Sequence, residues 1–393
     1  MAFLNHGSFG ACPKPVLDAQ AEWRARLERE PVRFFVRELE QLLDEARGAV
    51  AGFVGAQADD LAFVPNATSA VNTVLWSLAP SFAPGDEILF TSHGYTACAN
   101  ALSGLAERTG VRVVVAQVPF PVSGADAVVA AVLAAATPRT KLALIDHITS
   151  PTGLVFPIAK IVAGLAERGI DTLVDGAHGP GMVQLALDEL GAAYYAGNFH
   201  KWVCAPKGAA MLHVRRDRQA QMRPLVTSHG ASSTRTDRSR FRLEFDWTGT
   251  MDPSPVLCVP TALRVMGELL PGGWPMLMAS NRALALAGRR LLLDEFEQPA
   301  PCPDDMIGAL AAMPIPAGDA DGPPRQGGFA DKLQDALVDV HHIQVPIMPW
   351  PRSPERLVRI AAQLYNTPEQ YDYLAGALRT ELANEGRLDA TFG

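Results

Sequence analysis

The chain has 393 residues, of which 48% are hydrophobic, and a formal net charge of −8 at pH 7. Such a chain can bury a large core, and its length predicts two domains, or one large and one small domain. The basic residues are scattered, which argues against a nucleic-acid partner, and no segment reaches the length and hydrophobicity of a membrane span.

The cysteines also limit the class of protein. They are odd in number, widely spaced and without a Cys-x-x-Cys pair, which argues against both a disulfide framework and a metal site. The first residues lack a basic region followed by an apolar stretch, so we expect the protein to stay in the cytoplasm. The five cysteines are Cys12, Cys98, Cys204, Cys258 and Cys302.

The first two thirds of the chain are typical of an α/β domain. Two helices are predicted between residues 15 and 52, separated by Pro31. Short apolar runs then alternate with helix-like segments, which indicates βαβ units and a mostly parallel sheet. The predicted strands are residues 61–64, 87–90, 111–115, 142–146, 172–175 and 208–214.

The remaining third predicts a smaller α+β unit. A polar stretch, 228–242, is predicted to be a long exposed loop, and its arginines suggest an acidic group on the substrate. Residues 255–296 are predicted to be helical, and the Pro- and Gly-rich segment 297–328 to be an excursion around a short strand near Ile307. The predicted end is helix 329–340, strands 343–348 and 357–361, and helix 368–385.

Two residues far apart in the chain fit the chemistry of pyridoxal 5′-phosphate (PLP). This cofactor is a protonated pyridine that carries an aldehyde, so it requires a carboxylate at the ring nitrogen and an amine that forms a Schiff base. Asp175 ends an apolar run and Lys201 follows a second strand-like segment. Taken singly, such an Asp is more often a turn former or helix cap, and such a Lys is more often solvated. Ligands bind at the carboxyl ends of strands in open α/β sheets, so we expect the pair to meet there.

Two further segments fit the same edge of the sheet. The turn 64–70 follows a strand and opens a helix, where free backbone N–H groups suit a phosphate, although plain N-capping has the same pattern. Beyond the strand that ends at Phe90, Tyr95 or His93 could stack on the pyridine ring. We favour Tyr95 and include it among the catalytic residues.

Together these motifs resemble the class V aminotransferases of PLP fold type I, and within them the isopenicillin N epimerase-like branch. The resemblance implies a large PLP-binding domain over residues 12–255, with a mostly parallel seven-stranded sheet. It implies a smaller α+β domain over residues 256–393, joined by residues 1–11. The motifs are residues 4–10 (Leu-Asn-His-Gly-Ser-Phe-Gly), 66–68 (Asn-Ala-Thr), 175–178 (Asp-Gly-Ala-His), 197–202 (Gly-Asn-Phe-His-Lys-Trp) and 359–366 (Arg-Ile-Ala-Ala-Gln-Leu-Tyr-Asn).

The resemblance implies a role for each matched residue. Lys201 is expected to form the Schiff base and to move the Cα proton of the substrate, while Asp175 keeps the ring nitrogen protonated. Arg359 is expected to bind the substrate carboxylate through two parallel hydrogen bonds, with His6 also contacting substrate. The other expected cofactor contacts are Ser150 and His178 near the phenolic oxygen, and Asn66, Ala67, Thr68, Asn198 and His200 around the phosphate.

The resemblance also implies a homodimer. Thr250 is expected to reach the phosphate held by the neighbouring subunit, so that each active site is shared between two chains.

One departure from related enzymes narrows the reaction. Cysteine desulfurases carry His-His-Cys in the small domain, whereas this chain reads His341-His342-Ile343. Isoleucine cannot accept sulfur, so the persulfide mechanism lacks its nucleophile. A lyase that releases a free sulfur product without such a cysteine remains open.

The leading functional hypothesis is therefore a PLP enzyme that removes the Cα proton of an amino acid, most simply an epimerase or racemase of isopenicillin N epimerase type. A C–S β-lyase is the alternative, and a class V aminotransferase is third. A PLP-binding sensor without catalysis leaves the full set of reactive groups without a purpose. The side chain of the substrate is not predicted.

Overall fold

The computed structural model describes residues 1–319 and 331–388. Its largest element is a seven-stranded sheet in the order β2-β8-β7-β6-β5-β3-β4, in which only β8 runs antiparallel to its neighbours. The predicted α/β class and mostly parallel seven-stranded sheet are confirmed. The strands are β2 (Leu61–Val64), β3 (Glu87–Thr91), β4 (Arg112–Ala116), β5 (Thr140–Asp146), β6 (Asp171–Gly176), β7 (Tyr194–Asn198) and β8 (Ala210–Val214).

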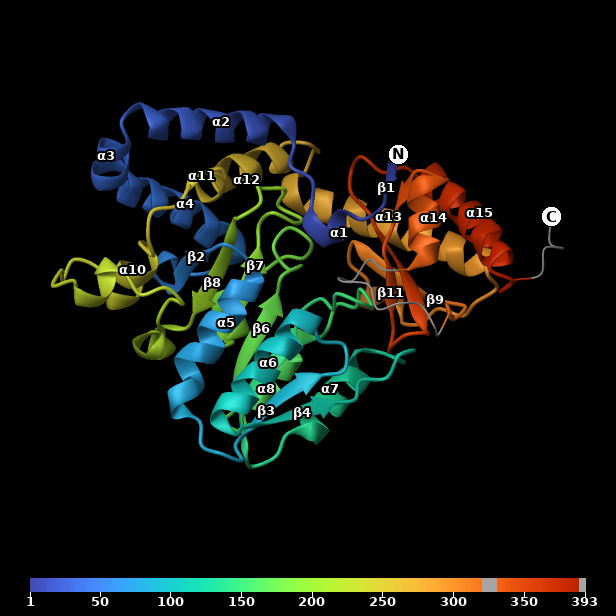
Figure 1. Cartoon of the computed structure of the whole chain (residues 1–393), viewed down its shortest axis with the longest axis horizontal. Helices are drawn as coiled ribbons and strands as arrows, with labels where there is room; N and C mark the ends of the chain where they lie inside the picture. The colour runs from blue at the N-terminus through green and yellow to red at the C-terminus, as the bar shows by residue number, and fades with distance from the viewer. Residues whose placement is uncertain (320–330, 389–393) are drawn as a thin grey trace.

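The sheet is covered on both faces, which explains why its central strands are nearly continuous apolar runs. Successive side chains of a strand point to opposite faces. In β5, for example, Leu142 and Leu144 pack under α5 (Ala67–Leu78) and α6 (Thr96–Thr109), whereas Ala143 and Ile145 pack toward α7 (Ala125–Ala135) and α8 (Ile158–Ala166). Figure 1 shows α5, α6 and α8 around the sheet.

The N-terminal helices form as the apolar spacing predicts. They are α2 (Lys14–Arg29), the short α3 (Pro31–Arg33) and α4 (Leu39–Val54), and a π-helical turn, Phe34–Glu38, joins the last two. Pro31 stands at the first turn of α3, where its missing N–H costs no hydrogen bond.

A smaller unit combines both ends of the chain (Figure 1). The N-terminal strand β1 (Ala2–Phe3) pairs in parallel with β10 (Ile343–Gln344). Antiparallel strands in the order β11-β12-β9 form a second small sheet. Its other elements are β9 (Leu310–Ile315), β11 (Ile347–Pro349), β12 (Arg356–Ala361), α13 (Gly273–Glu295), α14 (Lys332–Asp339) and α15 (Pro368–Asn384).

Several predicted boundaries differ from the structure. The strand expected near Ile307 is β9, which begins at Leu310, and the strand expected at 343–348 is divided into β10 and β11. The exposed loop expected at 228–242 contains a short 3-10 helix, His229–Ser232, and its last residues already belong to α10 (Arg240–Phe245). Residues 329 and 330 of the predicted helix, and the part of the predicted excursion from 320 to 328, lie outside the described residues.

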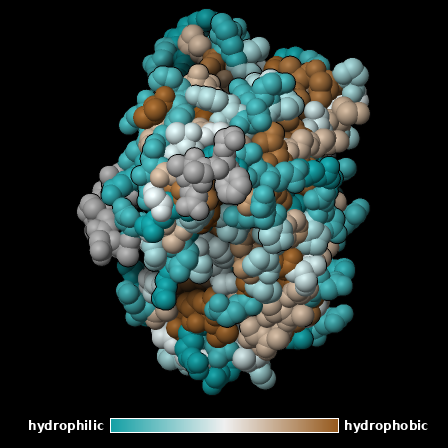
Figure 2. Space-filling view, turned by 90° about the vertical axis from the view of Figure 1, so that its right-hand side faces the viewer, coloured by the Kyte–Doolittle hydropathy of each residue, from teal (hydrophilic) through white to brown (hydrophobic). Residues whose placement is uncertain are grey.

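The domain boundary after residue 255 stays a prediction. Helix α11 (Ser254–Leu257) spans it, and α12 (Val259–Gly267) still packs on α2 and α4. The face turned toward the viewer in Figure 2 is mostly hydrophilic, and its hydrophobic side chains form separate patches. Among the described residues, no helix is both long and apolar enough to cross a membrane.

Candidate active site

A cavity of about 150 Å³ opens where the parallel strands end. Its walls come from the segments that follow β2, β3, β5, β6 and β7, and from α1 (His6–Phe9) at the N-terminus. Parallel strands end at one edge of their sheet, so residues distant in sequence meet here. The lining residues are Ser8, Phe9, Asn66, Ala67, Thr68, Tyr95, Asp146, Ile148, Ser150, Asp175, Ala177, His178, Asn198, His200 and Lys201.

The Lys201 amine is held by His178. The distance from Lys201 Nζ to His178 Nε2 is 3.0 Å, and Trp202 Nε1 donates a hydrogen bond to His178 Nδ1 at 3.2 Å. An indole N–H only donates, so Nδ1 must be the acceptor and the proton of a neutral His178 resides on Nε2. Burial and the charge of Lys201 lower the pKa of His178 well below its usual range. The neutral imidazole therefore presents an N–H to the amine.

The Lys201 amine is poised for proton transfer near neutral pH. Desolvation lowers its pKa to about 7, the positive charge of Arg359 acts in the same direction, and the charge of Asp175 opposes both. A base works best when its pKa lies near the working pH. Lys201 therefore has the properties of a general base and of an amine that reacts with an aldehyde.

Asp175 lines the cavity, and its carboxylate accepts two hydrogen bonds. Ala177 donates its backbone N–H to Oδ1 at 3.0 Å, and the Cys98 thiol donates to Oδ2 at 3.2 Å. Burial and the neighbouring Asp175 raise the pKa of Cys98 well above its usual range, so it remains a thiol. Both contacts fix the orientation of the carboxylate.

The turn before α5 forms another wall of the cavity. Asn66 caps the helix by accepting the Ser69 backbone N–H, and Asn198 Oδ1 accepts the Ala67 N–H, both at 2.8 Å. Asparagine side chains therefore hold this turn against the end of β7. The predicted helix N-terminus stands at the cavity, with Thr68 at its wall.

Tyr95 and His93 occupy different environments. Tyr95 lines the cavity and is 43% exposed. His93 is fully buried behind it, where it contacts Thr152 Oγ1 and Val118 O at 2.8 and 3.1 Å and packs on Trp350. Of the two rings considered for stacking on the cofactor, only that of Tyr95 is at the cavity wall.

Arg359 lies beside the cavity on β12, the central strand of the small sheet. It is 2% exposed and donates through its Nη1 group to the backbone and hydroxyl oxygens of Ser150. Its Nη2 group donates to Ser8 Oγ at 3.2 Å. Ser150 and Ser8 both line the cavity, so the guanidinium is directed toward it by hydrogen bonds to neutral partners.

His6 lies behind Lys201 rather than at the cavity wall. Its Nε2 is 3.0 Å from the Lys201 carbonyl oxygen and its Nδ1 is 2.7 Å from the Tyr365 hydroxyl. The N-terminal segment approaches closely here, because a Cβ at Gly10 would stand 2.0 Å from the His200 carbonyl oxygen. The structure thus shows no direct path from His6 to substrate, and contact between them stays a prediction.

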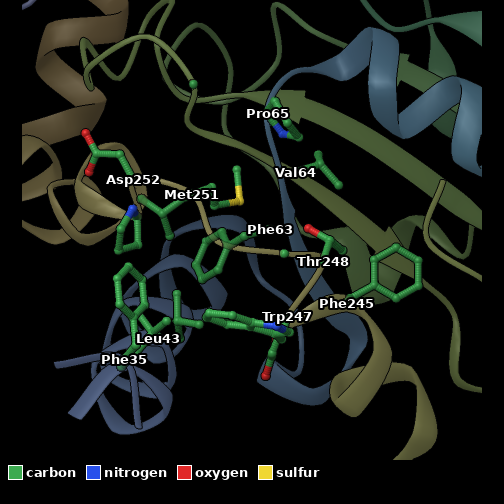
Figure 3. Close-up of a pocket in the computed structure, with 16 residues that line it drawn as sticks. Phe35, Leu43, Phe63, Val64, Pro65, Phe245, Trp247, Thr248, Met251 and Asp252 are labelled. Carbon is green, nitrogen blue, oxygen red and sulfur yellow. The ribbon is translucent and has the colours of Figure 1, made fainter. Parts of the chain in front are cut away.

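Thr250 is also absent from the cavity of its own chain. It is exposed, beside a hollow of about 90 Å³ lined by aromatic and aliphatic side chains (Figure 3). The rings of Phe35 and Trp247 meet edge to face there, 5.7 Å between centroids. Val64 and Pro65, which lead into the Asn66 turn, close the hollow on the other side.

The arginines of segment 228–242 do not support the suggested acidic substrate. Arg235 pairs with Glu40 and Asp237, and Arg238 pairs with Glu40 and Asp44. Arg240 and Arg242 likewise pair with carboxylates of the chain, and Arg242 is buried rather than in an exposed loop. Their charges are already compensated.

The cavity lacks the sulfur-accepting cysteine that a desulfurase requires. Ile343 is fully buried in β10, paired with Ala2. All five cysteines are described and free, and none of them lines the cavity.

One group of side chains in the described residues has metal-binding character. Ligand atoms of Asp60, Asp188 and His213 lie within 4.8 Å of one another. Arg216 Nε and Gln219 Nε2 both donate to Asp60 Oδ1 at 2.7 Å, so the charge of this carboxylate is balanced within the chain. The expectation that the protein holds no metal stays a prediction.

Sequence reasoning missed part of the cavity wall. Ser8, Phe9 and Ala177 lie within recognised motifs but had no assigned role, and Ile148 lies between the predicted strand 142–146 and Ser150. Asp146 was recognised only as the end of a strand. Its place in the sequence could have indicated a role in the site, because Asp146 is an acidic residue that ends a buried strand, as Asp175 does on the next predicted strand.

Comparisons with known proteins identify the family. The family described as aminotransferase class V matches residues 10–246. Isopenicillin N epimerases from Amycolatopsis lactamdurans and Streptomyces clavuligerus are 36% and 34% identical to this chain, covering 96% and 95% of it and 94% and 93% of their own lengths. An L-cysteine desulfhydrase from Arabidopsis thaliana is 28% identical over 98% of this chain and 88% of its own.

Solved structures agree with the fold. The cystine C-S lyase C-DES superposes with a TM-score of 0.78 at 20% identity, covering 96% of both chains. A cysteine desulfurase from Thermococcus onnurineus NA1 gives a TM-score of 0.80 at 18% identity, covering 98% of this chain and 95% of its own. A further structure of C-DES contains PLP and superposes on this chain with a TM-score of 0.79.

The chain is a PLP-dependent enzyme of fold type I. It belongs to the class V aminotransferase family, and its sequence relatives include epimerases and desulfhydrases. The expected family, fold and cofactor are confirmed.

The residues present fit PLP. The cavity combines an amine with a lowered pKa, a buried carboxylate with fixed orientation, and a helix N-terminus. In addition, His200 at the wall has a buried ring nitrogen, Nδ1, without a hydrogen-bond partner. The amine matches the aldehyde of PLP, the carboxylate matches its pyridine nitrogen, and the helix N-terminus matches its phosphate. His200 Nδ1 is a further polar atom that a ligand could satisfy.

Proposed function

We propose that this enzyme is an amino-acid epimerase or racemase of the isopenicillin N epimerase type, which removes and returns the Cα proton of its substrate. The observation that carries the proposal is the Lys201 amine, whose pKa of about 7 suits a base at neutral pH and which lies in one cavity with Asp175. The 36% and 34% identical epimerases support the choice of reaction.

When bound, PLP supplies an aldehyde that captures amines and a protonated ring that accepts the electrons released from Cα. Lys201 holds the cofactor between turnovers and moves the proton at Nζ. His178 presents its Nε2–H as a hydrogen-bond donor to the Lys201 amine, and the same N–H would hydrogen-bond to the phenolic oxygen of bound PLP. Asp175, whose carboxylate is fixed at the cavity, would hold the ring nitrogen of PLP and favour its protonated form.

Arg359 orients the substrate by binding its carboxylate. Its current partners are the neutral oxygens of Ser150 and Ser8, and a substrate carboxylate gives stronger, charge-assisted hydrogen bonds to the same guanidinium. An α-amino acid held in this way presents its Cα to the Lys201 amine.

Epimerisation requires a proton donor on each face of the planar carbon. Lys201 serves one face. Tyr95, which lines the cavity, serves the other, either directly or through a water that it holds.

The active site is shared in a homodimer. Thr250 is exposed beside the apolar hollow of Figure 3, and nearby Val36 and Met251 are 69% and 52% exposed. Covering such side chains favours association, and a second chain seated there brings Thr250 to the cofactor phosphate of its partner.

The test is incubation of the holoenzyme with L- and D-amino acids in deuterated water. An epimerase exchanges the Cα hydrogen of either enantiomer and produces the other enantiomer without accumulating the amine form of the cofactor. Pyruvate with a released thiol or sulfide would instead establish the lyase, the activity named for the desulfhydrase relative. Stoichiometric keto acid with pyridoxamine phosphate would establish an aminotransferase.

A further inference from the structure

A second carboxyl group lies next to Asp175. Asp146 ends β5, Asp175 lies near the end of the parallel strand β6, and the two residues are partners in the register. They continue the alternation set by Leu144 and Leu173, which pack on the α5 and α6 face. Register partners on one face have adjacent side chains, and both residues line the cavity. We call Asp146 and Asp175 the carboxyl pair.

The two members of the carboxyl pair have different surroundings. The Asp175 carboxylate receives two donors, the Ala177 N–H on Oδ1 and the Cys98 thiol on Oδ2. Asp146 is 2% exposed, and its Oδ2 has no hydrogen-bond partner. An ionised carboxylate that is buried with an unpaired oxygen is strongly disfavoured, whereas a protonated one has a hydroxyl to donate.

Two adjacent buried carboxyl groups do not both ionise, because each charge opposes the other. The proton belongs on the member that has an oxygen without a donor, which is Asp146, because its Oδ2 has no hydrogen-bond partner whereas both oxygens of Asp175 accept one. Burial and the charge of Asp175 raise the pKa of Asp146 well above its usual range, outweighing the opposing effect of the backbone N–H groups of Asp146 and Tyr95.

We propose that Asp146 is a positioning residue that remains protonated and donates a hydrogen bond to the Asp175 carboxylate. A carboxylate that accepts this extra bond is a weaker base, so a proton shared with the pyridine ring stays on the ring nitrogen. The carboxyl pair then places one negative charge, rather than two, against one positive ring. This inference rests on the proposed role of Asp175 and adds a residue with no role in the family motifs recognised above.

Infrared spectroscopy of the holoenzyme at neutral pH tests the protonation directly. The wild-type protein should show the C=O stretching band of a protonated carboxylic acid, and this band should disappear in Asp146→Asn. Aspartate labelled with ¹³C at its carboxyl group should shift the band in the wild-type protein, which identifies an aspartic acid even if the variant does not fold. Asp171→Asn, at the opposite end of β6, is the matched control and should keep the band.

Cofactor affinity tests the hydrogen bond. Asp146→Asn retains a donor of the same shape and should bind PLP with nearly wild-type affinity. Asp146→Ala loses the donor and should bind about tenfold more weakly, the factor that corresponds to about 1.4 kcal/mol. Equal losses in both variants would mean that the charge of Asp146 matters, and would overturn the proposal.

The result that would also overturn the inference is the absence of the acid band in the wild-type protein, or its persistence in Asp146→Asn. Failure of the proposed function looks different. In that case the wild-type protein would convert amino acids to pyruvate with a released thiol or sulfide, or to a stoichiometric keto acid, whatever the state of Asp146.

Discussion

Replacement of Arg359 by lysine separates the binding of the substrate carboxylate from the chemistry. The variant keeps the positive charge but loses the planar fork, so a carboxylate receives one hydrogen bond instead of two parallel ones. A hydrogen bond to a charged group contributes about 1.5–3 kcal/mol, which corresponds to a KM that rises roughly ten- to hundredfold. Because Arg359 is 2% exposed, water cannot readily replace the lost donor.

The assay is Cα hydrogen exchange in deuterated water, measured with an amino acid and with the corresponding amine that lacks the carboxylate. KM should rise for the amino acid alone. Arg356→Lys is the matched control, because Arg356 is buried on the same strand, three residues away, and pairs instead with Asp331 and Glu385. Equal losses for both substrates, or the same KM change in the control, would refute the role of Arg359.

Three further predictions follow from the site. The apoprotein should react with added PLP at a rate that rises with pH through about 7 and then levels off. The reason is that the neutral Lys201 amine is the nucleophile and its pKa is about 7. A rate that still rises toward about pH 10 would indicate an ordinary lysine. Asp175→Ala should retain bound cofactor but slow Cα proton exchange by a factor of roughly 10² to 10⁴, and near-wild-type exchange would assign the ring nitrogen to another group. L-Cysteine should leave no protein-bound persulfide detectable by mass spectrometry, and no single Cys→Ala variant should abolish turnover, because Ile343 occupies the desulfurase cysteine position and no cysteine lines the cavity.

The sheet and much of the site could be predicted because they depend on local patterns. Buried parallel strands are apolar runs, and their carboxyl ends meet at one edge, which brought Asp175 and Lys201 together without knowledge of any contact. Strand β7 was expected only as a strand-like segment before Lys201, without bounds, since a strand of five residues that contains Gly197 and ends at Asn198 gives a weak apolar signal.

The contacts that sequence could not provide are those between distant segments. Cys98 and Asp175 are 77 residues apart, and their hydrogen bond depends on how α6 packs over β6. His6 was expected to contact substrate because it lies in a recognised motif. In the structure the N-terminal segment crosses behind Lys201, and both ring nitrogens of His6 contact other groups. The protonation of Asp146 depends on burial and on the register of two strands, neither of which is visible in a short motif.

The most direct test of the central claim is to locate the lysine that carries the cofactor. The holoenzyme is reduced with borohydride, digested, and the peptide with the added mass of PLP is sequenced by mass spectrometry. The site described above predicts the tag on Lys201, whose amine lies in the cavity 3.0 Å from His178. A tag on Lys207, whose amine instead donates to the Gly10 carbonyl oxygen, would contradict it.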